Sequence, residues 1–316
     1  MSATQMETFM QRALISLSAL AVAALPALAD TKDYAVENFT EIDVSEAILV
    51  IYENGPSTSV SVEQADGDFS DIKIETKGDT LLIDRESASS GWRSNISTDY
   101  RNGELRAKVN GKKVPSYTVR ITSPEISSID ASRSARVTAD DINADTLTLE
   151  ASSSADLIIS GHANSVSIDA SSSSDVEADG LVANRLTIDA SSSADVEAQA
   201  SSDQQVLISA SSSADVELEL TGTAEVELEA SSSSDLELSG TCGQISIVAS
   251  SSTDIEARDL TCSTATIKAS SSADVNLSVT ESVEATASSG GDINVYGNPA
   301  QRNVRESSGG DVSFKS

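Results

Sequence analysis

Carboxylates recur at a nearly constant spacing through the C-terminal two-thirds of this 316-residue chain. An aspartate ends each copy of a motif of the type Ala-Ser-Ser-Ser-Ala-Asp, and a glutamate follows two residues later in several consecutive copies. Carboxylate oxygens are ligands that Ca²⁺ prefers, so stacked copies could form a weak calcium site. The candidate ligands are Asp175, Glu177, Asp195, Glu197, Asp215, Glu217, Asp235 and Glu237.

Two other roles for these carboxylates remain open. Like charges stacked about 5 Å apart repel by roughly 1 kcal/mol per pair in water-like surroundings, and salt and hydration can offset that repulsion. Alternatively, each aspartate could cap a turn by accepting hydrogen bonds from the backbone N–H groups of its serine run. A turn cap or a solvated face is the leading interpretation, and binding of a divalent cation is the alternative.

No group of residues in the sequence predicts a catalytic centre. His162 is the only histidine, and serines are so numerous that a Ser-His-Asp triad could be drawn almost anywhere. A polysaccharide-active enzyme, the third hypothesis, needs acidic metal ligands and a base in one cleft, whereas bases are few in the repeats. We therefore predict a non-enzymatic protein with no cofactor beyond possible weak calcium.

The intervals between the motif aspartates predict the elements that carry them. Successive intervals are 19, 20, 20, 20, 19, 20, 18 and 19 residues, and within a copy, as in 186–198, apolar or small residues alternate with polar ones. Alternation is the pattern of a β-strand, and a fixed period is typical of a solenoid. We predict an all-β, single-stranded parallel β-helix with about twenty residues per coil, carrying Asp156, Asp175, Asp195, Asp215, Asp235, Asp254, Asp274, Asp292 and Asp311.

The same alternation assigns the sides of each coil. We expect Leu186, Ile188 and Val196 to face inward, with the small Ser192 and Ala194 at a tight inward corner. Glycine-containing stretches such as 161–164 and 239–243 predict turns between copies. Expected to face outward are Ser191, Ser193, Asp195 and Glu197.

Two cysteines occupy the same position in adjacent copies. Cys242 and Cys262 each lie seven residues before the alanine that opens the next serine run. Adjacent coils stack about 4.8 Å apart, which falls within the Cα separation of a disulfide. We predict a disulfide between them, since export favours oxidation.

The first 29 residues predict an export signal. Arg12 precedes the apolar run 13–25, and Ala27 and Ala29 supply the small residues that a signal peptidase needs, so we predict cleavage between Ala29 and Asp30. The run is shorter than the roughly twenty residues of a comfortable bilayer span. The mature chain is therefore expected to have no transmembrane segment.

Charge and composition divide the rest of the chain. Residues 30–125 are predicted to be a β-rich N-terminal region or cap, and residues 126–316 the β-helix. Within the first, 86–120 has seven bases against three acids, whereas 126–316 has 31 acids against eight bases. The basic insertion is either a patch for a ligand or a neighbouring acidic flank, or a loop or hairpin on its own coil. The net charge of −30 disfavours nucleic acid as a partner.

The segment from Phe39 to Tyr52, then 60–62 and 81–83, followed by the serial serine motif, resembles the head GIN domain, a family described as heads of autotransporter adhesins. The resemblance covers the chain from about Asn38 onward. It implies a β-helical protein exported to the periplasm, cell surface or surroundings of a Gram-negative bacterium. It also implies an adhesin-like module. From the composition and the repeat, we expect that module to present an acidic Ser/Asp-rich face to an unknown cell-surface, glycan or protein ligand.

Overall fold

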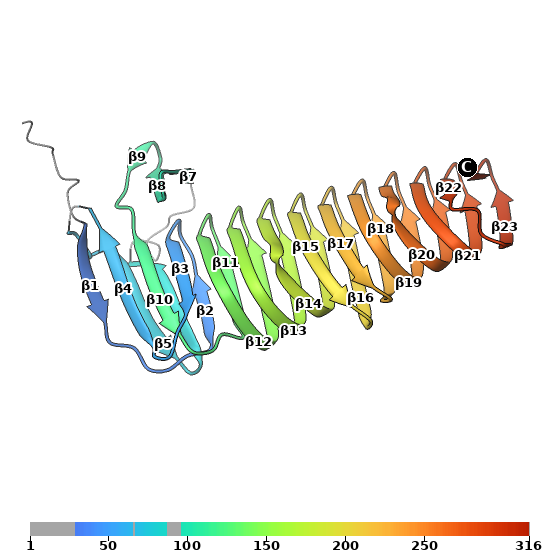
Figure 1. Ribbon diagram of the computed structural model, residues 1–316. Coiled ribbons are helices and arrows are strands. Elements are labelled where there is room, and N and C mark those ends of the chain that lie inside the picture. The colour runs from blue at the N-terminus through green and yellow to red at the C-terminus, as the bar shows by residue number, and fades with distance from the viewer. Residues whose placement is uncertain (1–28, 66, 87–95, 316) are drawn as a thin grey trace, which may run out of the picture.

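The computed structural model describes residues 29–65, 67–86 and 96–315. In this part of the chain, one continuous sheet contains 21 strands and a second sheet contains three. Figure 1 shows the large sheet wound into an elongated solenoid whose coils follow one another from the N-terminal to the C-terminal end. The predicted all-β parallel solenoid is confirmed.

Most coils consist of one long strand that bends, or of two shorter strands in its place. Parallel pairing joins equivalent residues of adjacent coils, so that Val196 pairs with Val176 on one side and Val216 on the other. The stretches 161–164 and 239–243, predicted as turns, are instead corners inside the continuous strands β13 and β19, next to which the register shifts. The strands are β11 (Ser128–Ser132), β12 (Arg136–Ser152), β13 (Asp156–Ser171), β14 (Asp175–Ser191), β15 (Asp195–Ser202), β16 (Gln205–Ser211), β17 (Asp215–Gly222), β18 (Glu225–Ser231), β19 (Asp235–Ser250), β20 (Asp254–Ser270), β21 (Asp274–Ser288), β22 (Asp292–Tyr296), β23 (Gln301–Ser307) and β24 (Asp311–Phe314).

The core is narrow and consists of ladders of branched and small apolar side chains. Ile188 and Val196 are each 1% exposed, and the alanines that flank the serine run, Ala190 and Ala194, are completely buried. Each of these residues stacks on its equivalent one coil away, at the spacing of paired strands. Alternation then forces the intervening polar residues outward, which positions the carboxylate rows.

The serine turns differ from the prediction in one respect. Ser192 and Ser193 both have positive φ, 56° and 61°, and both side chains are exposed, so the prediction that Ser192 faces inward is wrong. Two consecutive left-handed residues reverse the chain tightly, and Ala194 alone fills the corner. This conformation costs about 1–2 kcal/mol per non-glycine residue. Hydrogen bonds between turns offset part of that cost, as where Ser193 N–H donates to the Ser212 carbonyl oxygen at 3.1 Å.

The first coils do not follow the order of the chain. β2 (Glu41–Val44) and β3 (Leu49–Asn54) form one coil, and a second coil consists of β6 (Thr80–Arg85) and β10 (Thr118–Ser123). The coil of β2 and β3 comes first in the sequence, yet it lies between the coil of β6 and β10 and the coil that β11 begins. Residues 30–125 therefore include coils of the solenoid as well as a cap.

Both ends of the solenoid carry features that hinder further stacking. At the N-terminal end, β1 (Asp30–Tyr34), β4 (Ser59–Gln64) and β5 (Ile72–Lys77) pair in antiparallel fashion and bring charged residues to the edge. At the other end, Arg302 takes an inward position on β23, and its guanidinium lies 4.1 Å from the centre of the Phe314 ring. Charged residues on edge strands and inward-pointing charges protect sheet edges from pairing with other chains.

The basic insertion takes the place of a serine turn, because it joins β6 to β10. It contains the small antiparallel sheet of β7 (Ile96–Arg101), β8 (Glu104–Val109) and β9 (Lys112–Lys113), which projects beyond the coils in Figure 1. The sheet meets the solenoid where Tyr100 contacts the guanidinium of Arg136, 4.4 Å from the ring centre. Trp92 and Arg93 of the insertion lie outside the described residues.

The predicted signal peptide, except for Ala29, also lies outside the described residues, and β1 begins at Asp30. Across the part of the chain that the structure describes, no helix is long and apolar enough to cross a membrane.

Candidate functional site

The serine turns divide the outer surface of the solenoid into regions. The downstream face is the outward side of the strand segments that follow a serine turn, such as 195–200. The upstream face is the outward side of the segments that precede one, such as 205–210. The turns between them form the serine edge. A functional side chain on a face recurs once per coil, about 4.8 Å from its equivalent.

The predicted carboxylates form two rows on the downstream face. Asp195 pairs in register with Asp175 and Asp215, and Glu197 pairs with Glu177 and Glu217. Asp235 and Glu237 continue the rows on β19. Six of the eight predicted ligands line a groove of about 370 Å³, together with Asp254 and Glu256, which extend the rows onto β20; Asp175 and Glu177 are not in its lining. The six are Asp195, Glu197, Asp215, Glu217, Asp235 and Glu237.

Stacking changes the acid–base behaviour of the rows. Burial, followed by the charges of Asp195 and Asp235, raises the pKa of Asp215 above its usual range. Burial, and then Glu217 and Glu177, likewise raise the pKa of Glu197. These directions indicate that neighbouring carboxylates repel one another without a compensating partner.

The rows match neither a preformed metal site nor a set of turn caps. Across residues 29–65, 67–86 and 96–315, no three His, Cys, Asp or Glu side chains are grouped so that they could hold a metal ion. Calcium takes six to eight oxygen ligands that converge, whereas each coil offers outward carboxylates in parallel. The turn-cap hypothesis is wrong: serine-run N–H groups such as that of Ser173 donate to carbonyls of the next coil, here Ser192. The downstream face is a solvated acidic surface in the present arrangement.

A second acidic row lies on the upstream face, and sequence analysis missed it. Asp130, Glu150, Asp169 and Asp189 pair in register on successive strands, and Asp43 precedes them on β2. Each of the first four directly precedes the alanine that opens a serine run, which is the signal that could have revealed the row. The row was missed because the residue type at this position varies in later copies, which carry Ser209, Glu229, Val248 and Lys268 in turn.

The N-terminal part of this second row borders a hollow of mixed charge. The hollow measures about 360 Å³ and includes Asp43, Asp84 and Asp130 together with Lys73 and Arg133. Burial, then Asp43 and Glu150, raise the pKa of Asp130 to about 6. Among the carboxylates of the rows on both faces, Asp130 is therefore the one that becomes protonated closest to neutral pH.

We predict that the protein becomes more stable as the pH falls from 7.5 to 5. The raised folded-state pKa values of Asp130 and Asp215 mean that ionisation costs free energy in the folded state. That cost is present above the folded pKa and disappears as the pH falls from about 6 toward the unfolded value near 4. Allowing for solvent screening, we expect Tm to rise by roughly 3–6 °C between pH 7.5 and 5.

Thermal unfolding followed by circular dichroism checks this pH dependence. Asp215→Asn is the matched variant, because it removes one charge from the row: it should raise Tm at pH 7.5 and have a smaller effect at pH 5. A Tm that falls steadily from pH 7.5 to 5 would contradict the account of the rows. The lowered pKa values of Asp68, Glu75 and Asp203 oppose the trend only below about pH 4.

The upstream face changes character in its C-terminal half. A hollow of about 470 Å³ on β14, β16, β18 and β19 mixes hydroxyls and carboxylates with Leu207 and the exposed Val248. Beyond it, a hollow of about 570 Å³ spans β19, β20, β21 and β23. Uncharged polar side chains predominate there: Gln244, Thr264, Thr266, Ser282, Gln301 and Asn303.

The basic sheet brings together lysines that sequence analysis could only count. Lys108 lies directly opposite Lys113, and Lys112 follows opposite the next residue of β8. Within the described residues, none of these three lysines forms an ion pair, whereas Arg101 and Arg106 pair with carboxylates of their own sheet. The exposed sheet is thus a cationic surface at the N-terminal end of an acidic solenoid.

A buried network at the root of the basic insertion was also missed. Arg85 is 1% exposed and reaches Asp71 at 2.9 Å and the carbonyl oxygens of Glu46 and Pro115 at 2.8 Å. Its guanidinium also lies 4.9 Å from the centre of the Tyr117 ring. The sequence offers no signal that distinguishes this arginine from exposed ones, because the partners named here come from three segments that are distant in the chain.

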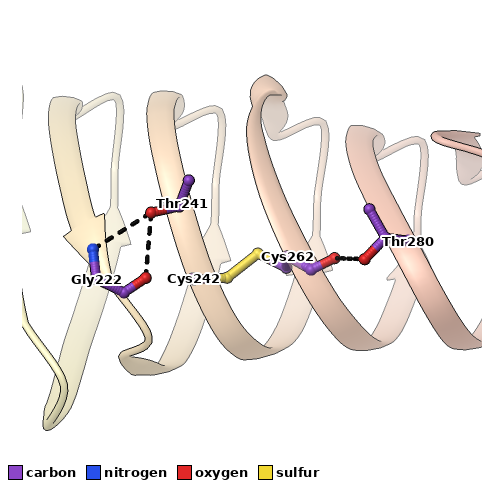
Figure 2. The surroundings of a disulfide bond; sticks show 5 residues. All are labelled: Gly222, Thr241, Cys242, Cys262 and Thr280. Atoms are coloured by element: carbon purple, nitrogen blue, oxygen red, sulfur yellow. Dashed lines mark hydrogen bonds between the residues drawn. A yellow bond between two sulfur atoms is a disulfide. The ribbon is translucent and has the colours of Figure 1, made fainter.

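Cys242 and Cys262 are bonded in the structure, with their Cα atoms 4.6 Å apart. Figure 2 shows the bond joining adjacent coils, with Thr241 and Thr280 making hydrogen bonds to neighbouring coils on either side. Both sulfur-bearing side chains are buried, with exposed fractions of 5% and 0%. The bond therefore ties β19 to β20 from inside the core.

We expect the double variant Cys242→Ala/Cys262→Ala to lose about 3 kcal/mol of unfolding free energy, because a loop of twenty residues is no longer closed in the unfolded chain. Urea unfolding of the oxidised protein and the variant measures the difference. Wild-type protein kept in dithiothreitol is the control and should approach the variant. Equal stability of oxidised and reduced wild-type protein would contradict the expectation.

Comparisons with known proteins add to this geometry. The model of the family "Putative auto-transporter adhesin, head GIN domain" matches residues 38–226 and 201–299. No curated protein matches the chain in sequence.

Similar solved structures include a putative adhesin from Parabacteroides merdae, with 16% identity and a TM-score of 0.44, where 92% of this chain and 97% of that chain are covered. Another is a putative lipid binding protein from Parabacteroides distasonis, with 17% identity, a TM-score of 0.39 and the same coverage.

Proposed function

Since this chain belongs to the family described as "Putative auto-transporter adhesin, head GIN domain", we propose that it is a non-enzymatic, adhesin-like module that binds a surface or a polymer outside the cytoplasm. The observation that carries the proposal is the placement of its polar groups in long rows on exposed faces. A ligand that repeats along its length can meet one group per coil on such a face, and many weak contacts then add up.

Export to the periplasm or the cell surface of a Gram-negative bacterium is part of the proposal. The bond between Cys242 and Cys262 supports it, because disulfides persist in oxidising compartments. The start of β1 at Asp30, directly after the proposed cleavage site at Ala29, agrees with a mature chain that begins there. N-terminal sequencing of the exported protein tests this assignment, and a retained N-terminus in the cytoplasmic fraction would overturn it.

The charge distribution narrows the class of partner. The chain carries a net charge of −30, so anionic polymers and anionic membrane surfaces are repelled over a Debye length of about 8 Å at physiological salt. Neutral glycans, or proteins with a cationic surface, are the partners that fit. The acidic downstream face keeps the elongated module soluble in this proposal.

A deletion of the gene in its own bacterium tests the proposed function. We expect the deletion strain to be retained less on a surface coated with a neutral glycan, such as yeast mannan, or on neighbouring bacterial cells, and expression of the wild-type gene to restore retention. Expression of a variant that cannot fold should not restore it. Unchanged retention of the deletion strain on every surface tried would contradict an adhesive role.

A second candidate function is calcium-dependent binding through the downstream face, favoured by the eight carboxylates that share one groove. We predict that 5 mM Ca²⁺ and 5 mM Mg²⁺ raise Tm equally, because both screen the rows and no converging ligand group is present in the described residues. Thermal unfolding in EDTA is the reference. A calcium-specific rise of several degrees would favour this second candidate by mass action, and Asp195→Asn should then abolish it.

A further inference from the structure

The C-terminal half of the upstream face stands out by its lack of net charge. From β19 onward, the outward residues of this face include one acid, Glu284, and two bases, Lys268 and Arg305. The downstream face of the same coils carries a carboxylate on every strand. A nearly neutral surface therefore persists beside acidic ones in a chain of net charge −30.

The hydrogen-bonding groups of this neutral surface are unused. None of the six uncharged polar side chains that line its hollow of about 570 Å³ donates or accepts a side-chain hydrogen bond within the described residues. Elsewhere such side chains pair between coils, as Asn184 does with Asn164 and Thr223 with Asp203. The six free side chains are Gln244, Thr264, Thr266, Ser282, Gln301 and Asn303.

The chemistry of the hollow matches a neutral glycan. Serine and threonine hydroxyls and the amides of Gln and Asn each donate and accept hydrogen bonds, as sugar hydroxyls do. Apart from Ala265 and Val283 the lining is polar, which leaves little apolar area for peptide side chains. The two charged side chains that line the hollow already have partners: Glu284 accepts a hydrogen bond from Arg305, and Arg302 donates one to Asn298.

The spacing of the groups matches an extended chain. Thr264 pairs in register with Gln244 and Ser282, and Ser282 pairs with Gln301, so one polar group recurs per coil at about 4.8 Å. That interval is close to the length of one pyranose residue in an extended glycan. Successive sugar units could therefore meet equivalent side chains along the axis.

We propose that the hollow on β19, β20, β21 and β23 binds an uncharged, extended polysaccharide, with its sugar units lying along the solenoid axis. This inference rests on the proposed adhesive function and names the ligand class and the face that serve it. No aromatic ring lines the hollow, so hydrogen bonds carry the affinity. Adhesion through it depends on several units binding at once.

Affinity electrophoresis in native gels containing hydroxyethylcellulose, galactomannan or yeast mannan tests the proposal. We expect at least one of these neutral polymers to retard the purified protein, and the anionic polygalacturonate to leave it unretarded. The variant Thr264→Ala/Thr266→Ala/Gln301→Ala should bind about 100-fold more weakly, since three hydrogen bonds are lost. The control Thr148→Ala/Ser167→Ala removes hydroxyls from the same face near its acidic end and should bind like wild type.

The outcomes separate this inference from the proposed function. Retardation that the triple variant retains in full would overturn the assignment of the hollow, provided that its Tm equals that of wild type. A wild-type protein that no neutral polymer retards would overturn the glycan inference, while the deletion strain would still report on adhesion. Loss of retardation in the triple variant alone supports the inference.

Discussion

Replacing Arg85 by methionine is expected to lower the free energy of unfolding by about 3–5 kcal/mol, because the Glu46 and Pro115 carbonyl oxygens lose a charged donor and the partly buried Asp71 carboxylate loses its arginine. Arg85 is completely surrounded, and its guanidinium holds Asp71, the Glu46 and Pro115 carbonyls and the Tyr117 ring in place. Methionine fills a similar volume but offers no donors. The first coils, which join out of chain order around this residue, should therefore loosen together.

Urea unfolding and hydrogen exchange measure this effect. The exchange protection of β2, β6 and β10 should fall first in Arg85→Met, because their ends meet at the guanidinium. Arg106→Met is the matched control: its side chain is 49% exposed and its pair with Glu104 is worth less than about 1 kcal/mol. A loss below about 1 kcal/mol for Arg85→Met would mean that the network does not hold the N-terminal coils.

Replacing Gly240 by alanine is expected to cost about 3 kcal/mol or more, combining a left-handed backbone with overpacking. The φ of Gly240 is +101°, and a Cβ built there would lie 1.8 Å from the Leu220 carbonyl oxygen. That oxygen belongs to the neighbouring coil, where Leu220 pairs with Gly240 in the ladder. The backbone of one coil must move, and interstrand hydrogen bonds at this corner are lost.

Gly78→Ala separates the two causes. Gly78 also has a positive φ of +63°, but a Cβ there would meet nothing within 4 Å. It should cost only the strain of the left-handed conformation, about 1–2 kcal/mol. Equal losses for the two variants, measured by urea unfolding, would contradict the close approach of the coils at Leu220.

The repeat made much of the fold predictable. Because one period equals one coil, the register of Val176, Val196 and Val216 follows from counting, and so does the adjacency of Cys242 and Cys262. Alternation within a copy then determines which side chains face the core. These inferences need only local pattern and a constant period, and both are strong in residues 126–316.

What escaped prediction depends on contacts that no period describes. The position of β2 and β3 between later segments arises from pairing across 39 to 87 residues, as the hydrogen bonds of Ser45 with Asp84 and of Ser127 with Thr40 illustrate. The turn was misjudged at Ser192 because serine is small enough for an inward corner, whereas its left-handed backbone turns it outward. Small size alone does not reveal backbone conformation.

The candidate functional surfaces also include one that the sequence predicted and one that it did not. The downstream rows were predictable because their residue type repeats, from Asp175 through Asp274. The neutral hollow was not, because its groups vary between Gln, Thr and Ser while sharing only their polarity and register. When the residue type at an equivalent position changes from coil to coil, the shared polarity becomes apparent only after the coils are aligned in three dimensions. The functional surface proposed here therefore emerged from the fold rather than from a motif.

The most direct test of an adhesive solenoid is retention of protein-coated beads on a glycan-bearing surface under flow. Beads that carry the folded wild-type protein should be retained on a surface coated with a neutral glycan on the order of tenfold more than beads that carry Gly240→Val, since many weak contacts act together. A valine at position 240 would clash with the Leu220 carbonyl oxygen and is expected to disrupt the coil. Soluble wild-type protein should displace them. Equal retention of both kinds of bead, on the neutral glycan and on bacterial cells alike, would contradict the claim that the folded faces of this chain mediate adhesion.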